Sequence, residues 1–401
     1  MKLERLLFTS IHSYLDPSNG AATASRDLLE LLAGRGVDCR ALSMGILDYR
    51  EETPLAEVLG RLDAPVRRCT AELARGGEAP VYDLELAGVR LTIAPTASSR
   101  LERSPTMEEA VAFLDLADQA FDKFRPQVVL TYGGHPVSRE LMARARKRGI
   151  AVVFHLHNFA YDDLTAFDSA TAVLVPSEYC RRHYARTIGL DATAIPLPSS
   201  PARVLARDRD PEYLTFVNPT PEKGVTVFAR IAAELGRRRP DVPILVVEGR
   251  ATTDWLSRVD LDLSGVPSLN RMANTPDARD FYRVTRAVLM PSLWRESGGL
   301  IAREAMVNGI PTLASDRGAL PETLGDSGFV FAIPSRCTPT SGCVPTAREI
   351  APWIATIERL WDDPAWEAGH AASALAAAQA GSPDRLTDRY LEFFGRLAAD
   401  P

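Results

Sequence analysis

The stretch VLMPSLWRESGGLIAREAMVNGIPTLASDRGALPETLGDSGFVFAIP, residues 288–334, decides how we interpret the fold of this chain. The short apolar run at residues 287–290 predicts a buried strand, which Pro291 and Ser292 end. A glycine-containing loop follows at residues 296–299, and then a helical pattern with Gly309 at the position of a C-cap. Residues 310–314 predict another strand. A strand, a glycine-containing loop, a helix and a strand in this order form a unit that binds anions at the helix N-terminus.

Two carboxylates flank this predicted anion site, Glu296 in the loop and Glu304 on the helix. Carboxylates accept hydrogen bonds from hydroxyl groups, whereas a site for phosphate alone would not favour two of them. A ligand that carries both phosphates and many hydroxyls is a nucleotide sugar. The alternative is that Glu304 is a solvated helix residue and that Glu296 only lies near the positive end of the helix dipole.

Glu296 and Glu304, with seven residues between them, resemble the E-x7-E motif of retaining nucleotide-sugar glycosyltransferases, family 4 in particular. The sequence GALPE at residues 318–322 resembles the same family. The resemblance implies the glycosyltransferase B fold, an α/β architecture of two Rossmann-like, doubly wound domains that face each other across a cleft. It is strongest over residues 213–334 and weak over residues 45–105, where we expect acceptor recognition.

Length and composition limit the class of protein. The 401 residues suggest two or three domains, and 46% apolar with 24% charged residues is usual for soluble globular proteins. The net charge of −6 argues against a general nucleic-acid partner. No stretch is apolar enough to span a bilayer, and the first apolar run is too short for a signal peptide. We therefore expect a cytoplasmic protein, with peripheral membrane contact left open because some relatives act on lipid-linked acceptors.

The five cysteines predict reduced thiols, since their number is odd and the chain is large. Cys337 and Cys343 lie in a loop rich in proline and glycine. Whether they pair, hold a metal or are incidental stays open at this point, although no second Cys or His pair completes a zinc set.

The organisation that we expect is an acceptor-side domain over residues 1–195, a donor domain over residues 212–381, and a last helix, within residues 382–401, that crosses back onto the first domain in this fold. The first domain begins with a β–loop–α–β pattern over residues 6–43. Asn19 and Gly20 lie at the turn into its helix, where glycine would let backbone amides face a ligand; a plain turn is the alternative. The family usually has two glycines here, so Asn19 is a departure.

Several histidines follow predicted strands of the first domain, where ligands of open α/β sheets bind. The strand at residues 150–154 leads into His155 and His157, which share side-chain parity along an extended chain. The resemblance assigns a contact with the donor sugar to His157. Our acceptor-side candidates are His12, His135 and His155, and the alternative for His135, His155 and His157 is a satisfied core histidine. No third ligand of matching context accompanies His155 and His157, so no metal site is predicted.

The second half restarts with a strand at residues 213–217 and a loop at residues 218–224. This loop resembles the family's P-E-K-G turn, in which the lysine, here Lys223, reaches the donor diphosphate. The family's preceding arginine is absent, and Asn218 and Thr220 stand in that loop instead. Arg250, after the next predicted strand, is our hypothesis for the missing charge. For the nucleotide base we expect a loop near Asn270 and Met272.

The resemblance implies a glycosyltransferase that moves a sugar from a nucleotide diphosphate sugar, of UDP or GDP type, with retention of anomeric configuration. Lys223 and the backbone amides of Ser297, Gly298, Gly299 and Leu300 would stabilise the leaving diphosphate. Glu296 would bind sugar hydroxyls and Glu304 the ribose, with His157 positioning the sugar. No cofactor or obligatory metal is expected.

The acceptor, whether a saccharide, a lipid-linked sugar, a small molecule or a peptide, is not identified. The alternative functions are a nucleotide-sugar 2-epimerase of the same fold and a non-catalytic nucleotide-sugar-binding subunit.

Overall fold

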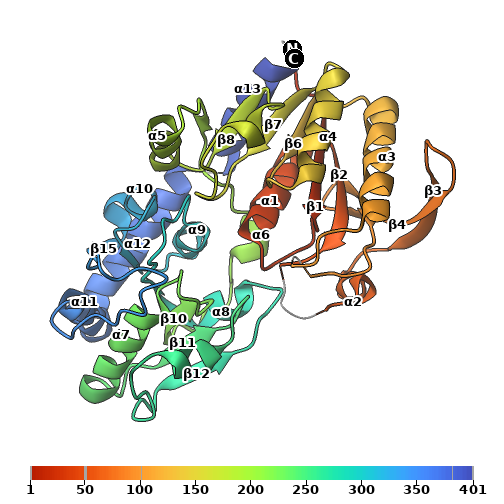
Figure 1. Cartoon of the computed structure of the whole chain (residues 1–401). Helices are drawn as coiled ribbons and strands as arrows, with labels where there is room; N and C mark the ends of the chain where they lie inside the picture. Colours follow the sequence, from red (N-terminus) through yellow and green to blue (C-terminus); the bar gives the residue numbers. More distant parts are fainter. Residues whose placement is uncertain (1, 49–51, 101, 382, 400–401) are drawn as a thin grey trace. The chain divides into compact units, whose positions relative to one another are not determined.

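The chain divides into two α/β units, each built around a mainly parallel sheet (Figure 1). The computed structural model describes residues 2–48, 52–100, 102–381 and 383–399. The first unit comprises Met1–Pro176, Arg181–Pro198 and Pro383–Pro401, and the second comprises Ser177–Cys180 and Ser199–Ser382.

The first unit contains a nine-stranded sheet in the order β3-β4-β5-β2-β1-β6-β7-β8-β9. Its strands are β1 (Arg5–His12), β2 (Asp38–Ile46), β3 (Arg67–Glu72), β4 (Glu78–Leu86), β5 (Val89–Ala94), β6 (Val128–Thr131), β7 (Ala151–His155), β8 (Ala172–Val175) and β9 (Thr193–Ala194). Only β4 runs antiparallel to its neighbours β3 and β5. The apolar central strands are buried between helices, as a parallel sheet with crossover helices requires.

The helices of this unit are α1 (Gly20–Gly34), α2 (Leu55–Gly60), α3 (Met107–Phe124), α4 (Pro136–Lys147), α5 (Glu178–Thr187) and α13 (Pro383–Ala399), with the 3-10 turn η1 (Thr165–Phe167). Helix α5 begins in the segment that is grouped with the second unit. Helix α13 packs into the core of the first unit through Leu386, Tyr390, Phe393 and Phe394. The Tyr390 hydroxyl also donates to the carbonyl of Pro196 at 2.9 Å.

The second unit contains a six-stranded, fully parallel sheet in the order β12-β11-β10-β13-β14-β15. Its strands are β10 (Tyr213–Val217), β11 (Ile244–Val247), β12 (Leu269–Met272), β13 (Thr285–Met290), β14 (Thr312–Ser315) and β15 (Phe329–Phe331). Its helices are α6 (Pro201–Val204), α7 (Val225–Arg238), α8 (Arg279–Val284), α9 (Leu300–Val307), α10 (Leu320–Leu324), α11 (Ala351–Asp362) and α12 (Pro364–Ala380), with the 3-10 segments η2 (Thr253–Arg258) and η3 (Gly325–Ser327). Two buried clusters cover the two faces of this sheet.

The predicted alternation of strands and helices is confirmed in both units. The residues near Asn270 and Met272, where we expected a loop that binds the base, form the edge strand β12 beside β11, so the loop assignment is wrong and the contact with the base stays a prediction. Several short elements, such as α2 and β3, were not predicted.

None of the helices in the described ranges is long and apolar enough to cross a membrane. The Sγ atoms of Cys337 and Cys343 lie 2.6 Å apart. Within the described residues, no group of three or more His, Cys, Asp or Glu side chains is arranged to hold a metal ion.

Candidate functional site

An ion pair between Lys223 and Glu296 lies at the centre of the candidate site in the second unit. The Nζ atom of Lys223 is 2.7 Å from Oε1 of Glu296. The same oxygen accepts hydrogen bonds from the Ser292 hydroxyl at 2.7 Å and from the Trp294 indole N–H at 2.8 Å. Lys223 also lies over the Trp294 ring, 4.8 Å from its centroid. The pair therefore has a fixed position at the carboxyl ends of β10 and β13.

Three donors on one oxygen keep Glu296 ionised although the residue is only 6% exposed. Burial alone would raise the pKa of this carboxyl group. The positive charge of Lys223 and the hydrogen bonds from Lys223, Trp294 and Ser292 outweigh burial and hold the pKa below its ordinary value. The site thus presents a carboxylate and an ammonium group together.

Two glycines bring the backbone segments of this site into direct contact. Gly318 has a φ of +69°, and a Cβ atom there would lie 2.2 Å from the carbonyl oxygen of Glu296. Ala319 donates its N–H to that same oxygen at 2.7 Å. Gly224 has a φ of +84°, and a Cβ atom there would lie 1.8 Å from the carbonyl oxygen of Pro291. Only glycine fits at either position, so the loop that carries Lys223 and the loop that carries Glu296 are fixed by main-chain packing.

The N-terminus of α9 follows this ion pair. Its N-cap is Gly299, which has a left-handed backbone (φ +59°, ψ +57°) and no side chain to cap the helix. Gly298 and Leu300 flank it, and Ser297 begins the turn. A helix N-terminus with a glycine cap leaves its first amides to a ligand or to water, and its dipole favours an anion there.

Glu304 lies on helix α9, eight residues after Glu296 in the sequence, and its environment differs from that of Glu296. It is 4% exposed and accepts a hydrogen bond from the Tyr282 hydroxyl at 2.7 Å. Burial raises the pKa of Glu304 to about 7, although the Tyr282 hydrogen bond and the charge of Arg203 act in the opposite direction. The alternative of a solvated helix residue is therefore wrong: Glu304 is a buried carboxyl group that titrates near neutral pH.

The loop after β10 holds the loop after β11. Asn218 has a φ of +61°, and its Oδ1 accepts the N–H of Ala251 at 3.1 Å. Thr220 accepts the N–H of Lys223 on its hydroxyl at 3.2 Å. Asn218 and Thr220 thus shape the two loops, and Arg250 is an exposed residue of the turn that Asn218 holds. Asn270 donates to the carbonyls of Ser268 and Ile244, and Met272 ends β12, so these two residues support the strand edge next to this turn.

A histidine cluster lies at the carboxyl ends of β1, β6 and β7 in the first unit. The rings of His155 and His157 have centroids 3.9 Å apart, which confirms that they lie on the same side of the chain. Tyr132 packs edge-on against His157 at 5.7 Å and stacks on His12 at 5.5 Å. Burial lowers the pKa of His157 to about 3 and the pKa of His155 well below its usual range. These imidazoles are therefore neutral near pH 7.

His12 and His135 belong to the same edge of the sheet. Burial, with the nearby His135 as a second cause, lowers the pKa of His12 to about 4. His135 is the N-cap of α4, and its Nδ1 accepts the N–H of Val137 at 3.2 Å. Its side chain is therefore engaged in capping.

Asn19 is likewise the N-cap of α1, and Oδ1 accepts the amides of Ala21 and Ala22 at 2.9 and 3.2 Å. The Asn19 side chain therefore occupies the amides of Ala21 and Ala22, and a ligand contact at Asn19 or Gly20 stays a prediction. Asparagine is among the best N-cap residues, and this signal was present in the sequence.

Sequence reasoning missed Ser292, Trp294, Tyr282 and Tyr132 as members of these sites. Ser292 and Trp294 stand four and two residues before Glu296, so their position in the loop was a usable signal. Tyr282 and Tyr132 reach their partners only through the tertiary fold, and no local pattern marks them.

Residues 211–339 match the family described as Glycosyl transferases group 1. The chain is 32% identical over 197 residues to a D-inositol 3-phosphate glycosyltransferase of Frankia alni, covering 45% of each chain. It is 26% identical over 264 residues to a GDP-mannose-dependent alpha-(1-6)-phosphatidylinositol monomannoside mannosyltransferase of Mycolicibacterium smegmatis, covering 58% of this chain and 65% of that protein. The chain thus spans about half the length of the first of these relatives.

Its fold is similar over nearly its whole length to that of a sucrose-phosphate synthase from Thermosynechococcus elongatus. The TM-score is 0.67 at 16% identity, with 99% of this chain and 100% of that one covered. This likeness shows that the two units have the glycosyltransferase B fold.

Proposed function

We propose that this chain, which belongs to the B-fold glycosyltransferases related to family 4, transfers a sugar from a nucleotide diphosphate sugar to a hydroxyl group with retention of anomeric configuration. The observation that carries the proposal is the Lys223–Glu296 pair beside the N-terminus of α9. A cation, uncapped amides and a carboxylate together suit a ligand that has a diphosphate and several hydroxyls.

Each group of the site has a role in this proposal. Lys223 and the amides of residues 298–300 would stabilise the negative charge that develops on the departing diphosphate. The Oε2 atom of Glu296 would accept hydrogen bonds from sugar hydroxyls, while its Oε1 stays bound to Lys223, Ser292 and Trp294. Glu304 would bind the ribose, and Arg250 would add a second positive charge near the phosphates.

The proposed reaction needs no protein base. The acceptor oxygen forms a bond to the anomeric carbon on the face from which the diphosphate leaves. The bond between that carbon and the phosphate oxygen breaks, and the proton of the acceptor hydroxyl passes to the departing phosphate. The neutral His12, His155 and His157 are our candidates for residues that position hydroxyl groups, because an imidazole with a lowered pKa both donates and accepts.

For the donor we propose a UDP or GDP sugar, and for the acceptor a hydroxyl of a saccharide or a phosphorylated polyol. The names of the two relatives, which specify an inositol phosphate and GDP-mannose, support these classes. We also propose that no divalent metal takes part, because Lys223 and the helix amides supply positive charge. Turnover should then be unchanged by EDTA, and a loss that Mg²⁺ restores would contradict this part.

The test begins with a thermal-shift screen of UDP, GDP, ADP and dTDP sugars against the full chain, since a ligand of the native state raises its apparent stability. With the donor that binds, release of nucleoside diphosphate and formation of an α-glycoside from an α-linked donor are then measured. Lys223→Met and Glu296→Gln should each lower release by ~10²-fold or more, while Lys147→Gln, at an exposed lysine of α4, should not change it. Binding without release, or an epimer of the donor sugar as product, would contradict transfer.

A further inference from the structure

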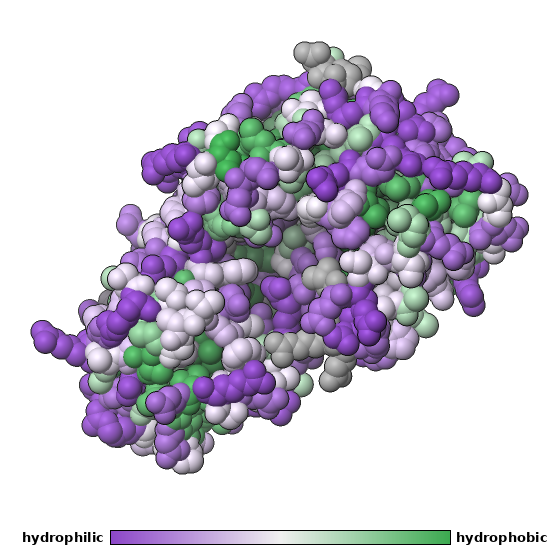
Figure 2. All heavy atoms as spheres, viewed as in Figure 1, coloured by the Kyte–Doolittle hydropathy of each residue, from purple (hydrophilic) through white to green (hydrophobic). Residues whose placement is uncertain are grey.

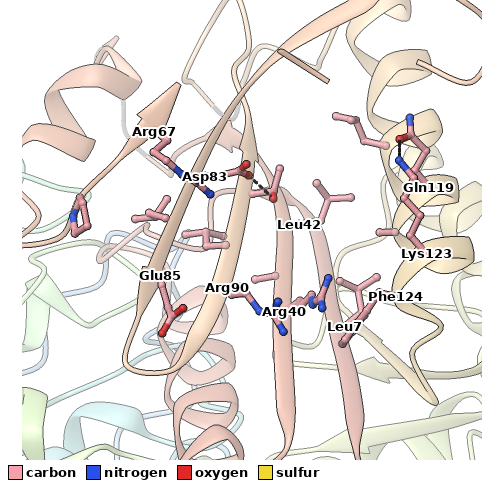
Figure 3. Close-up of a pocket in the computed structure, with 17 residues that line it drawn as sticks. Leu7, Arg40, Leu42, Arg67, Asp83, Glu85, Arg90, Gln119, Lys123 and Phe124 are labelled. Atoms are coloured by element: carbon pink, nitrogen blue, oxygen red, sulfur yellow. Dashed lines mark hydrogen bonds between the residues drawn. The ribbon is translucent and has the colours of Figure 1, made fainter. Parts of the chain in front are cut away.

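A cavity of about 500 Å³ lies in the first unit, between one face of the sheet and helix α3 (Figure 3). Strands β1, β2, β4 and β5 form its floor, and residues 116–124 of α3 form one wall. A cavity of this size is in the range that holds a small organic ligand. It is not part of the candidate site described above.

Strand register shows which side chains share this face. Leu7 pairs with Arg40, Arg40 with Arg90, and Arg90 with Glu85, so these four residues form one row across the sheet. The next row on the same face runs through Leu42, Thr92, Asp83 and Arg67. Paired residues of neighbouring strands project to the same side. The two rows therefore place leucines in the middle of the sheet and charged residues toward its β3 edge.

The cavity has an excess of positive charge. Its lining includes Arg40, Arg67, Arg90 and Lys123, against Asp83 and Glu85. Asp38 accepts hydrogen bonds from Arg90 at 2.8 and 2.9 Å and lies 3.5 Å from Arg40, so one carboxylate serves two arginines. The ammonium group of Lys123 donates to the neutral amide of Gln119 at 2.9 Å. Within the described part of the chain, neither Arg67 nor Lys123 forms an ion pair.

Arg40 is held in a position that suits an oxyanion. Its guanidinium carbon lies 4.0 Å from the centroid of the Phe124 ring. Its Nε is buried and has no acceptor among the residues that the structure describes. A guanidinium that is fixed against an aromatic ring keeps its planar set of donors available for phosphate or carboxylate oxygens.

The rest of the lining is apolar. Leu7, Leu42, Leu116 and Phe124 contribute to it, and each is less than a tenth exposed. Figure 2 shows apolar side chains among charged ones over the side of the first unit that carries α3, β3 and β4. Cations beside an apolar pocket fit a ligand that has an anionic head and an apolar body.

We propose that this cavity, defined by Arg40, Arg67, Arg90, Lys123, Leu42 and Phe124, binds an anionic amphiphile, a molecule with a phosphate or carboxylate head and a short apolar chain. Leu7 and Arg40 are each the third residue of their strands, β1 and β2, whereas His12 ends β1. The cavity is therefore toward the amino ends of the strands, and the histidine cluster is at their carboxyl ends. A ligand in the cavity does not take part in sugar transfer, so this site does not depend on the function proposed above.

The test uses octyl phosphate as the probe and the full chain in an isothermal titration. Two comparison ligands separate the contributions of the head and the chain: 1-octanol has the chain but no charge, and inorganic phosphate has the charge but no chain. Excess UDP or GDP is present throughout to occupy any nucleotide site. We expect octyl phosphate to bind at least tenfold more tightly than either comparison. Equal binding of 1-octanol or of inorganic phosphate, or no binding of octyl phosphate, would overturn the proposal.

Two variants tie the binding to the cavity. Lys123→Gln removes one exposed charge at the end of α3, and Ala120→Leu fills the wall without changing the charge. Each should weaken octyl phosphate at least tenfold, while the matched Lys147→Gln, at the end of α4, should not. If both cavity variants bind octyl phosphate as the parent chain does, the cavity is not the site.

A co-sedimentation experiment with lipid vesicles distinguishes a membrane lipid from a soluble amphiphile as the ligand. Co-sedimentation with phosphatidylcholine vesicles that contain phosphatidic acid, lost in Lys123→Gln, assigns the head group to a membrane lipid. Binding of octyl phosphate without co-sedimentation assigns it to a soluble amphiphile. Co-sedimentation that is unchanged in both Lys123→Gln and Ala120→Leu counts against a lipid in this cavity.

Discussion

Replacing Glu304 with glutamine should make the second unit more stable at neutral pH but not at acidic pH. Burial raises the pKa of Glu304 from its ordinary value of 4.5 to about 7 in the folded chain. Below pH 4.5 the carboxyl group is protonated in both the folded and the unfolded chain, so its pKa shift contributes nothing to stability there. Between pH 4.5 and 7 the unfolded chain releases the proton and the folded chain retains it. The free energy of unfolding therefore falls as the pH rises through this window.

The size of the effect follows from the two pKa values. A change in pKa from 4.5 to about 7 corresponds to about 3 kcal/mol of lost stability once the pH exceeds 7. Glu304→Gln keeps the shape of the side chain and cannot ionise, so it does not incur this loss. For a unit of this length, about 3 kcal/mol corresponds to a difference of roughly 6–12 °C in Tm.

The assay is calorimetric unfolding of the parent chain and Glu304→Gln at a series of pH values from acid to slightly alkaline. The difference in Tm of the second unit should grow as the pH rises through the window and then become constant. Asp326→Asn, which neutralises an exposed carboxylate of the same unit, is the matched control and should show no such growth. A Tm difference between parent and Glu304→Gln that is independent of pH, or that grows toward acid, would refute the reasoning.

Three further predictions concern the ion pair and its supports. Lys223→Met should lower turnover by ~10²-fold or more, measured as release of nucleoside diphosphate, because it removes a charge that acts on the leaving group; loss of donor binding with normal turnover would contradict this role. Gly318→Ala should destabilise the chain by more than Gly342→Ala, because both glycines have positive φ but only Gly318 faces a backbone oxygen; left-handed strain alone is worth about 1–3 kcal/mol, and equal losses in urea unfolding would show that the contact is unimportant. Trp294→Phe should lower turnover about tenfold, since one hydrogen bond to a charged group is worth about 1.5–3 kcal/mol. Trp255→Phe in the same unit is its control, and a Trp294→Phe enzyme with unchanged kcat would refute a role for the indole N–H.

Strands with apolar runs were predictable because they are buried on both faces. Residues 213–217 were predicted as a strand with the bounds that β10 has. Edge strands were not predictable in the same way. β3 (RRCTAE) and β12 (LNRM) have no fully buried residue, so no apolar pattern marks them. They are strands because β4 and β11 supply backbone hydrogen bonds, which the sequence of the edge itself does not encode.

The candidate site was predictable as a set of residues but not as an arrangement. Resemblance and local context selected Lys223, Glu296 and Gly299, and all three are in the second unit near the ends of neighbouring strands. The direct Lys223–Glu296 pair was not predicted, since 73 residues separate the two. The capping roles of His135 and Asn19 were not predicted, and their assignment to ligand contact stays a prediction. Histidine is an unusual N-cap, and the signal for it was Pro136 at the first helical position.

The positions of Gly224 and Gly318 explain why the Lys223–Glu296 ion pair is available to a ligand and is not needed to stabilise the fold. A buried ion pair contributes little net stability, because desolvation of both groups offsets their attraction. Here the pair does not hold the two loops together, since Gly224 against Pro291 and Gly318 against Glu296 already do so through the main chain. Lys223 and the second oxygen of Glu296 are therefore held in place before a ligand binds. These charged groups do not have to reorganise when it does. It follows that a substitution that adds a side chain at Gly224 or Gly318 should impair the site, even though neither glycine has a functional group.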